Sequence, residues 1–352
     1  MPRLTPEALT GFVRRIFKAA GASDDIARLV SRSLVASNLA GHDSHGVVRV
    51  GQYLDSIAAG ELDPRATPAV VRETEVMALL DARRGFGQVA ARRAMLIAVD
   101  KAKAQGLAAT TLFNCGHIGR VGEWVQMAAD QNLIGLGFCN GGHAGGYVAP
   151  YGGAARRLGT NPLAAAIPLQ GREPVVLDFA TSVRAEGKVR IARNQGRPVP
   201  GGWIVNAEGR PTTNPNDLYA GGMLLPAGEY KGYGLSLLVE FLGGVLTGDG
   251  CPALPGYRKG NGVLFLALAI DAFRPLDDFL AEGAALAEAV KATPPAPGFD
   301  EVLLPGEPET RAARQRRATG IEIDGATWGQ LTGAATALGV AIPAPIGGTG
   351  SR

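Results

Sequence analysis

The sequence predicts an α/β or mixed α+β fold, with helical segments at both ends and a middle region in which strands and helices alternate. Helical spacing of apolar residues runs up to Gly60 and returns beyond Pro275. From Glu73 onward, short apolar runs alternate with amphipathic stretches. The 352 residues are 46% hydrophobic, so the chain is long enough to bury a large core without disulfides.

Two amphipathic helices open the chain. Thr5 and Pro6 provide a hydroxyl cap and a first-turn proline, and Gly21 ends this first helix. Ser23 begins a second helix, which ends before Gly41. The apolar stripes of both helices are predicted to enter a core: Leu9, Phe12, Val13, Ile16 and Phe17 in the first, and Ile26, Leu29, Val30 and Leu34 in the second.

Shorter apolar runs define the middle region. They predict strands over 76–81, 108–113, 134–139 and 174–177, and helices over 90–105 and 122–132. The later part is predicted to contain a long surface loop over 198–226 and a buried, nearly all-apolar helix over 231–248. Beyond Pro275 the chain is expected to be mostly helical, with a loose end after Pro343.

Composition and charge exclude several classes of protein. The formal net charge is only +3, which argues against a nucleic-acid partner. The three cysteines are widely spaced and form no CxxC pair, so neither a disulfide framework nor a zinc site is expected. The longest apolar run, over 263–270, is too short to cross a bilayer, and Met1 to Thr10 lacks the pattern of a signal peptide. We therefore expect a cytoplasmic protein without a membrane partner.

The densest group of catalytic side chains lies in the run from Gly41 to Arg49. Ser44, His45 and Arg49 bring a hydroxyl, an imidazole and a guanidinium together, and Tyr53 follows. An imidazole donates or accepts a proton near neutral pH, and the planar fork of arginine matches a carboxylate. This combination suits a small carboxylate substrate.

A single helix over 44–59 is predicted to arrange these side chains. If Asp43 or Ser44 caps it, then His45, Arg49 and Tyr53 fall at i, i+4 and i+8 on one face. The opposite face then enters a core through Val47, Val50, Leu54 and Ile57.

Two other chemistries are disfavoured by the same residues. His42 and His45 lack a third histidine nearby, because the other two in the chain are His117 and His143, so no metal site is expected. A hydrolase built on Ser44 and His45 is weak, since adjacent side chains point apart and the chain has no GxSxG elbow.

Three further positions suggest contacts with an anion or a ligand. The glycine loop 116–122 lies between a strand and a helix and could present amides to a phosphate, but its GxxGxxG spacing is not the Rossmann fingerprint, and a tight turn explains the glycines as well. Lys231, at a helix entrance, either binds an anion or is simply solvated. Residues 178–182 at a strand end offer oxygen ligands or cap a turn.

Five motifs in order along the chain carry a resemblance to a known family. They are 42–49 with Tyr53, 117–122, 159–163, 178–182 with 187–188, and 231–234; 304–307 and 320–321 fit as well. The chain resembles the malate/L-lactate dehydrogenase-type oxidoreductases that lack a Rossmann domain, and the match spans nearly the whole chain.

The resemblance implies an α+β fold with a mixed sheet and no Rossmann domain. Residues 1–65, with the catalytic run, would pack with a helical segment over 275–352, while 66–274 would form the α/β region that binds cofactor and substrate. The resemblance also implies a homodimer that interconverts small 2-oxo and 2-hydroxy acids, of the malate or lactate kind, with NAD or NADP. NAD is the first expectation.

The same resemblance implies roles for individual residues. His45 takes the position of the proton donor and Ser44 that of its hydrogen-bonding neighbour, although in some members the residue matching His117 does the acid/base work. Arg49, Tyr53 and Thr160 take substrate-binding positions. The implied dinucleotide contacts are His117, Ile118, Gly119, Arg120, Val121, Asp178, Phe179, Ala180, Thr181, Ser182, Lys231, Gly306, Glu307 and Pro308.

Two alternatives stay open at this point. Some imine-reducing members have an aspartate where this chain has Lys188, so a cyclic ketimine reductase is possible but lacks that partner. The other alternative is a nucleotide-binding protein without turnover, against which the intact set of Ser44, His45 and Arg49 argues.

Overall fold

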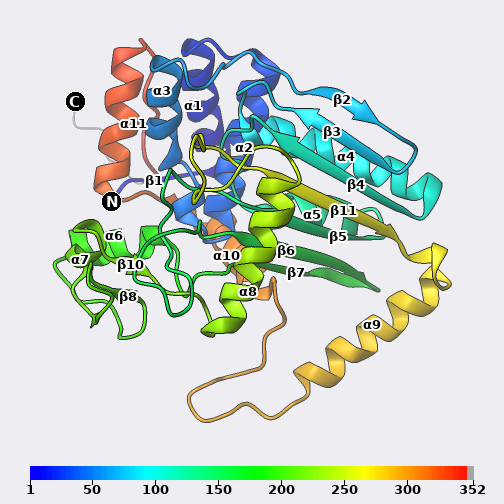
Figure 1. Ribbon diagram of the computed structural model, residues 1–352. Helices are drawn as coiled ribbons and strands as arrows, with labels where there is room; N and C mark the ends of the chain where they lie inside the picture. Colours follow the sequence, from blue (N-terminus) through cyan, green and yellow to red (C-terminus); the bar gives the residue numbers. More distant parts are fainter. Residues whose placement is uncertain (347–352) are drawn as a thin grey trace.

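A seven-stranded mixed sheet forms the centre of the computed structural model, which describes residues 1–346 (Figure 1). The strands are β2 (Ala69–Glu73), β3 (Met77–Asp81), β4 (Leu107–Phe113), β5 (Leu133–Cys139), β6 (Pro162–Leu169), β7 (Arg172–Ala180) and β11 (Val263–Ala269). Their order is β2-β3-β4-β11-β5-β6-β7, and only β3 and β4 pair in parallel. The predicted mixed sheet is confirmed.

The position of β11 excludes a Rossmann arrangement. The longest apolar run of the sequence inserts between β4 and β5 and pairs antiparallel with both, so that Val263 lies opposite Leu112 on one side and Cys139 on the other. The strand–loop–helix–strand unit that begins at β4 therefore has no directly paired parallel strands, which a dinucleotide-binding βαβ unit requires.

Small side chains let two helices lie close to the sheet. α4 (Gly87–Gln105) packs on β3, β4 and β11, and α5 (Val121–Ala129) packs on β5, β6 and β7. A Cβ at Gly135 of β5 would lie 2.5 Å from the carbonyl oxygen of Val125 in α5, so only glycine allows this approach. Both predicted helices are present, and each begins one to three residues earlier than the spacing suggested.

A second core joins the two ends of the chain. It is built from α1 (Pro6–Ala19), α2 (Asp24–Leu39), α3 (Arg49–Ala58), α11 (Gly325–Ala337) and the strand pair β1 (Arg3–Leu4) and β12 (Ile321–Glu322). The predicted caps are confirmed, since Thr5 Oγ1 accepts from Ala8 N and Ser23 Oγ from Ile26 N. α10 (Glu307–Thr319) packs beside α2, whereas α9 (Leu276–Lys291) packs against β6 and projects from the opposite end of the molecule (Figure 1).

The predicted long loop over 198–226 is wrong. This segment forms a three-stranded sheet of β8 (Ile204–Val205), β9 (Pro211–Thr212) and β10 (Met223–Leu224), with α7 (Pro215–Tyr219) beside it. Together with α6 (Glu186–Asn194) it encloses its own small core around Val189, Ile204 and Leu224. Two-residue strands are too short to produce a hydrophobic period, which is why the sequence pattern missed them.

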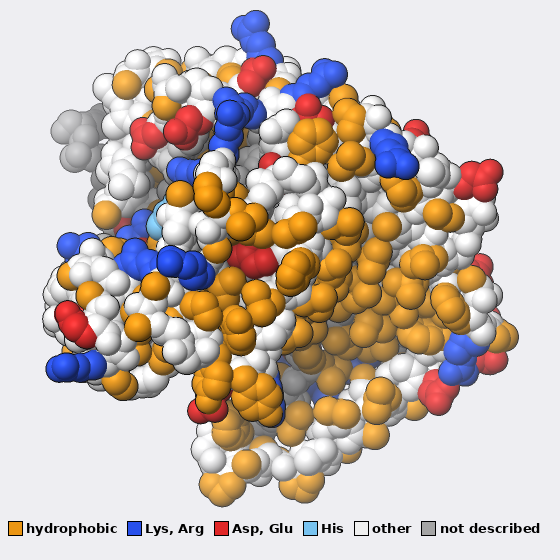
Figure 2. All heavy atoms as spheres, in the orientation of Figure 1, with side chains coloured by type: hydrophobic (Ala, Val, Ile, Leu, Met, Phe, Trp, Pro, Cys, Tyr) orange, Lys and Arg blue, Asp and Glu red, His pale blue; other side chains and the backbone are white. Residues whose placement is uncertain are grey.

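The predicted apolar helix over 231–248 exists but is not buried. It consists of α8 (Tyr230–Val239) followed by η2, a π-helical segment (Glu240–Val245). Leu238, Phe241 and Leu246 are 43%, 60% and 60% exposed. Figure 2 shows hydrophobic side chains gathered over α8 and over the sheet between α8 and α9.

Two remaining expectations concern the surface and the C-terminus. Among residues 1–346, no helix is both long enough and apolar enough to cross a membrane. The predicted loose end after Pro343 falls partly on residues 347–352, which lie outside the described part of the chain.

The central strand predicts a stability test. Phe265 of β11 is fully buried between the neighbouring strands and helices, so Phe265→Ala should lower the free energy of unfolding by about 3–5 kcal/mol. Phe273, which is 72% exposed, is the matched control, and Phe273→Ala should change the free energy of unfolding by less than about 0.5 kcal/mol. Urea denaturation measures both, and equal effects would show that β11 is not a core strand.

Candidate active site

The catalytic run does not form the predicted continuous helix. Residues Asp43–His45 form a short 3₁₀ turn, η1, and α3 begins only at Arg49. Asn38 of α2 causes the interruption, because its side-chain oxygen accepts from Val47 N at 2.9 Å and its Nδ2 donates to Asp43 at 2.6 Å. The far face behaves as expected, with Val47 and Val50 fully buried and Leu54 and Ile57 packed against the same core.

Gly46 makes this arrangement possible. A Cβ at Gly46 would lie 2.3 Å from the Oδ1 atom of Asn38, so any side chain would displace the amide that shapes the turn. Asp43 does not cap a helix; instead it pairs with Arg316 of α10 at 2.6 and 3.0 Å. The turn that carries Ser44 and His45 is thus fixed by α2 and α10.

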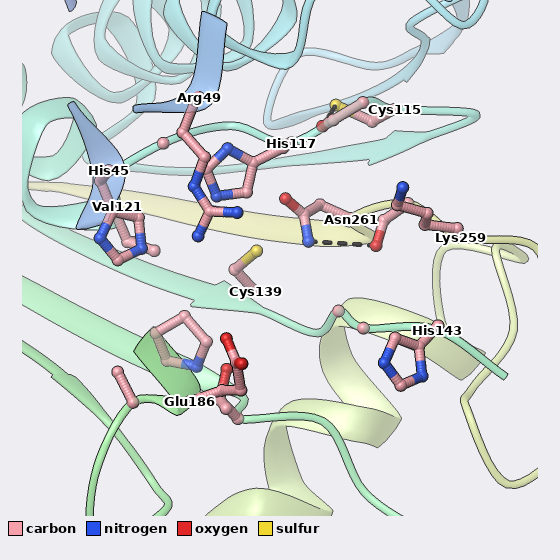
Figure 3. Close-up of a pocket in the computed structure, with 18 of the residues that line it drawn as sticks. His45, Arg49, Cys115, His117, Val121, Cys139, His143, Glu186, Lys259 and Asn261 are labelled. Carbon is pink, nitrogen blue, oxygen red and sulfur yellow. Dashed lines mark hydrogen bonds between the residues drawn. The ribbon is translucent and has the colours of Figure 1, made fainter. Parts of the chain in front are cut away.

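A cavity of about 1000 Å³ opens beside this turn. In Figure 3, Arg49 and His117 lie across the cavity from Glu186, and His143 and Lys259 lie towards its far end. The structure brings to this cavity the following predicted residues: Ser44, His45, Arg49, Tyr53, His117, Gly119, Arg120, Val121, Thr160, Asp178, Phe179, Ala180 and Ser182.

The other predicted contacts lie elsewhere. Ile118 and Thr181 are buried behind the wall of the cavity, and Thr181 Oγ1 donates to the carbonyl oxygens of Thr160 and Asn161. Lys231 is exposed on the first turn of α8 and does not line the cavity. Gly306 and Glu307 line a second hollow, of about 770 Å³, and Pro308 follows them in the first turn of α10.

The two imidazoles of the site lie face to face. The rings of His45 and His117 are stacked, with centroids 5.6 Å apart and planes 18° apart. His45 Nδ1 lies 3.1 Å from Ser44 Oγ, and His117 Nδ1 lies 2.8 Å from the hydroxyl of Tyr53. The structure therefore gives each histidine a hydroxyl partner on Nδ1 and leaves Nε2 for a ligand.

Gln88 contacts the site, and the sequence analysis did not single it out. Its Nε2 donates to the Tyr53 hydroxyl oxygen at 2.7 Å, which leaves the Tyr53 hydrogen to be donated to His117 Nδ1. Neutral His117 then carries its proton on Nε2. The available signal was a glutamine at the start of the apolar stripe of α4, followed by the buried Ala91 and Met95 at helical spacing.

Burial and neighbouring cations keep both imidazoles neutral. Burial is the main cause that lowers the pKa of His45 to about 3, and the charges of Arg49, His42 and Arg120 lower it further. Burial, Arg49 and His45 likewise hold the pKa of His117 well below its usual range. A neutral imidazole is the form that accepts a proton.

Arg49 is a cation held inside the protein by neutral groups. Its Nε donates to the Ser44 carbonyl oxygen and its Nη1 to Gln52 Oε1, both at 2.7 Å. Burial lowers the pKa of Arg49. In the described part of the chain no carboxylate lies within ion-pair distance of its guanidinium, and Arg49 lines the cavity, so its remaining donors are available to an anion there.

The N-terminus of α5 is already occupied by a protein carboxylate. Asp178 lies inside β7, not after its end as predicted, and its Oδ2 accepts from Gly122 N at 2.7 Å. Ile118 N donates to Asn261 Oδ1. Two of the amides that this loop could have presented to a phosphate are therefore already bonded, and the alternative of a tight turn fits the loop better. Arg120, in contrast, lines the cavity, and its buried Nε has no hydrogen-bond partner among residues 1–346.

Comparison with known proteins identifies the family. Residues 4–332 match the family model described as malate/L-lactate dehydrogenase. The chain belongs to this family. Hydroxycarboxylate dehydrogenase B of Escherichia coli K12 is 36% identical over 96% of the chain and 95% of that protein. Other relatives are named malate, L-lactate and L-sulfolactate dehydrogenases.

Solved structures agree with the assignment to the malate/L-lactate dehydrogenase family. A putative malate/lactate dehydrogenase from E. coli superposes with a TM-score of 0.91 at 36% identity, covering 96% of each chain. The Δ1-piperideine-2-carboxylate reductase of Pseudomonas syringae has a TM-score of 0.84 at 31% identity, covering 95% of this chain and all of that one. The chain is an oxidoreductase with the predicted α+β fold, and it uses a nicotinamide cofactor.

The neutral imidazoles predict how stability depends on pH. An unfolded histidine titrates near pH 6.5, whereas His45 in the fold has a pKa of about 3. Below pH 6.5 the unfolded chain therefore binds more protons than the folded chain. The free energy of unfolding should fall as pH is lowered, by up to about 1.4 kcal/mol per pH unit for each such group.

Urea denaturation at several pH values between about 7 and 5 measures this dependence. The variants His45→Asn and His117→Gln should each flatten the fall relative to the wild-type protein. The comparison cancels the opposite contribution of Asp178, whose pKa burial raises. Identical pH profiles for variants and wild type would show that the two imidazoles are not held neutral.

Proposed function

We propose that this protein interconverts a small 2-oxo acid and the corresponding 2-hydroxy acid with NAD or NADP. The observation that carries the proposal is the partly buried Arg49 guanidinium, which has no carboxylate partner among residues 1–346 and lies beside two neutral imidazoles in one cavity. A partly buried cation favours an anionic ligand, because the ligand offsets the hydration that the charge has lost. A 2-oxo acid presents a carboxylate and a carbonyl on adjacent carbons, as this geometry requires.

In this proposal Arg49 binds the substrate carboxylate. Its planar fork makes two parallel hydrogen bonds, which orients the neighbouring carbonyl towards the imidazoles. Thr160 lines the same cavity and offers a hydroxyl to the carboxylate. The bound carboxylate also offsets the positive field of Arg49, which is one cause of the low pKa values of His45 and His117.

His45 is the proposed proton donor in reduction and proton acceptor in oxidation. Without substrate it is neutral, the form needed to take the hydroxyl proton of a 2-hydroxy acid. Ser44 holds its Nδ1 so that Nε2 meets the reacting oxygen. His117, with its Nε2–H fixed by Tyr53, is proposed to hydrogen-bond the same oxygen.

The proposed cofactor path runs along α5 and β7. At one end of each element, Val121 of α5 and Ala180 of β7 line the substrate cavity. At the other end, Ala129 of α5 and Arg172 of β7 line the second hollow. Arg120, whose Nε has no partner among the described residues, suits a phosphate at the substrate-cavity end of this path, and Gly306 and Glu307 border the far end. When bound, the nicotinamide ring supplies or accepts the hydride. NAD is proposed first and NADP second.

A homodimer in the cytoplasm is proposed as the working form. The exposed apolar face of α8 and η2, which includes Leu238 and Phe241, is continuous with the open part of the sheet (Figure 2). Exposed apolar patches of this kind mark protein interfaces. Sedimentation velocity should show a dimer that Phe241→Asp dissociates, and a monomeric wild type would exclude the homodimer.

The cysteines support the proposed cytoplasmic location. All three thiols are buried and free, which fits a reducing compartment.

Absorbance of NADH and NADPH against a panel of acids tests the function. The panel contains glyoxylate, pyruvate, oxaloacetate, hydroxypyruvate, phenylpyruvate, sulfopyruvate and one cyclic imine. Oxidation with an oxo acid supports the proposal and shows the cofactor preference. Oxidation with the imine alone would favour the ketimine reductase alternative, which the likeness to the piperideine carboxylate reductase motivates and Lys188 argues against. Cofactor binding without turnover would favour a nucleotide-binding protein.

Arg49→Lys separates substrate binding from chemistry. Lysine keeps the charge but loses the bidentate fork, so KM for the oxo acid should rise by roughly 10-fold or more. Gln52→Glu is not a suitable control, because the new carboxylate would pair with Arg49. Gln131→Glu, on an exposed turn, is the suitable control. An unchanged KM would remove Arg49 from the substrate site.

Replacing each imidazole decides the acid/base assignment. His45→Ala should lower kcat by roughly 10²-fold to 10⁴-fold, while the affinity for NADH, measured by fluorescence titration, stays unchanged. His117→Ala should lower kcat less, because it removes a hydrogen bond and not the proton carrier. If turnover survives in His45→Ala and is lost in His117→Ala, the two roles are exchanged.

A further inference from the structure

We propose that Glu240 is a positioning residue for the substrate site. Its buried carboxylate holds the loop that carries Thr160 and, through two asparagines, the loop that carries His117. The inference rests on the proposed function, since it concerns the same site. No motif of the sequence pointed to Glu240, which lies in an apolar stretch where a carboxylate is unexpected.

Three N–H groups converge on this carboxylate. Glu240 is 5% exposed, and its Oε1 accepts from Asn161 Nδ2 at 2.8 Å and from Gly159 N at 3.2 Å. Its Oε2 accepts from Asn140 Nδ2 at 3.2 Å. Gly159 and Asn161 flank Thr160, so one side chain holds both neighbours of a residue that faces the cavity.

The chemistry of these partners requires a carboxylate. All three are donors, and a carboxylate accepts on both oxygens, whereas a glutamine would turn an NH2 group towards one of them. Hydrogen bonds to a charged acceptor are also stronger than those to a neutral one. Burial of a charge is costly unless it is hydrogen-bonded on all sides, and here three protein donors provide those bonds.

The loop around Thr160 depends on being held. Asn161 is fully buried and has a φ of +42°, a left-handed conformation that is strained for a residue other than glycine. Its Nδ2 also donates to Ser236 Oγ at 2.9 Å. On the other side, the Thr160 carbonyl oxygen accepts from Thr181 N at 3.0 Å. A shift at Asn161 would therefore move Thr160 within the cavity.

A second branch leads from Glu240 to the histidine loop. The carbonyl oxygen of Asn140 accepts from Asn261 Nδ2, and Asn261 Oδ1 accepts from Ile118 N, both at 3.0 Å. Ile118 follows His117 directly. In Figure 3, Asn261 lies between the His117 side of the cavity and Lys259. The same carboxylate thus restrains both loops that face the substrate.

The backbone around Glu240 brings it close enough to act. It begins the π-helical segment η2, a conformation found frequently at functional sites. A Cβ at Gly243 would lie 2.8 Å from Asn140 N, and one at Gly244 would lie 2.5 Å from Asn140 Nδ2. Glycines at both positions let this helix rest directly on Asn140.

Glu240→Gln tests the proposal with little change of shape. KM for the oxo acid identified in the panel should rise about 10-fold, because charged hydrogen bonds to the substrate loop are lost, while the affinity for NADH changes by less than about 2-fold. Glu208→Gln, an exposed glutamate on a distant turn, is the matched control and should change neither value. An unchanged KM in folded Glu240→Gln would overturn the proposal.

Hydrogen exchange gives a readout that does not need turnover. Amides over 158–163 and 117–119 should exchange about 10-fold faster in Glu240→Gln, since the hydrogen bonds that hold both loops weaken. If the wild type reduces none of the acids, the proposed function fails, and Glu240 is judged on exchange alone. Unchanged exchange overturns the positioning role whatever the activity.

A milder variant covers the case in which Glu240→Gln does not fold. Ser236→Ala removes one of the acceptors of Asn161 Nδ2 and leaves the carboxylate in place. It should raise KM about 3-fold and speed exchange over 158–163 but not over 117–119, because the Asn140 branch is intact. Equal exchange changes in both loops, or in neither, would contradict the arrangement proposed here.

Discussion

The partly buried positive charge of Arg49 is the constraint on which the site depends. The charge is partly desolvated, is supported by a carbonyl and an amide, and lacks a neighbouring carboxylate in the described residues. It lowers the pKa of both imidazoles, and in the proposed function it binds the substrate carboxylate. The turn over residues 43–48, the amide of Asn38 and the pairing of Asp43 with Arg316 all keep this charge in position.

The cavity is assembled from parts that are far apart in the sequence. Ser44, His45 and Arg49 come from the N-terminal helical core, His117 from the loop after β4, and Thr160 from the segment before β6. Polar networks connect these segments beneath the surface: Gln88 and Tyr53 behind His117, and Glu240 with Asn140 and Asn261 behind Thr160 and the histidine loop. Buried hydrogen-bond networks of this kind restrict the arrangement of the side chains that they join.

Much of the fold could be predicted because long apolar periods report long elements. The helices α1, α2, α4 and α5 and the strands β3, β4 and β5 follow such periods, and the caps at Thr5 and Ser23 are local chemistry. β2, β6, β11 and the short strands β8 to β10 were not predicted as strands. The residue types of the site, Ser44 to Arg49, were also predictable, since their density is visible along the chain.

Features created by distant contacts could not be predicted. The break between His45 and Arg49 depends on Asn38, whose role appears only when α2 packs beside the turn. The amide of Gly122 is unavailable to a phosphate because it donates to Asp178, which lies on the distant strand β7. The predicted burial of α8 was wrong. An all-apolar helix indicates that its surface is covered, but the sequence does not show whether the same chain or another molecule covers it.

The insertion of β11 imposes an order on biosynthesis. β4 and β5 leave the ribosome early, but the strand that joins them is made only after the small three-stranded sheet and α8. Until then both strands present unpaired backbone edges, which attract other chains. The nascent protein is therefore expected to need protection from aggregation during this interval, and a chain truncated before Asn261 would have neither a continuous sheet nor the Asn261 contact behind His117.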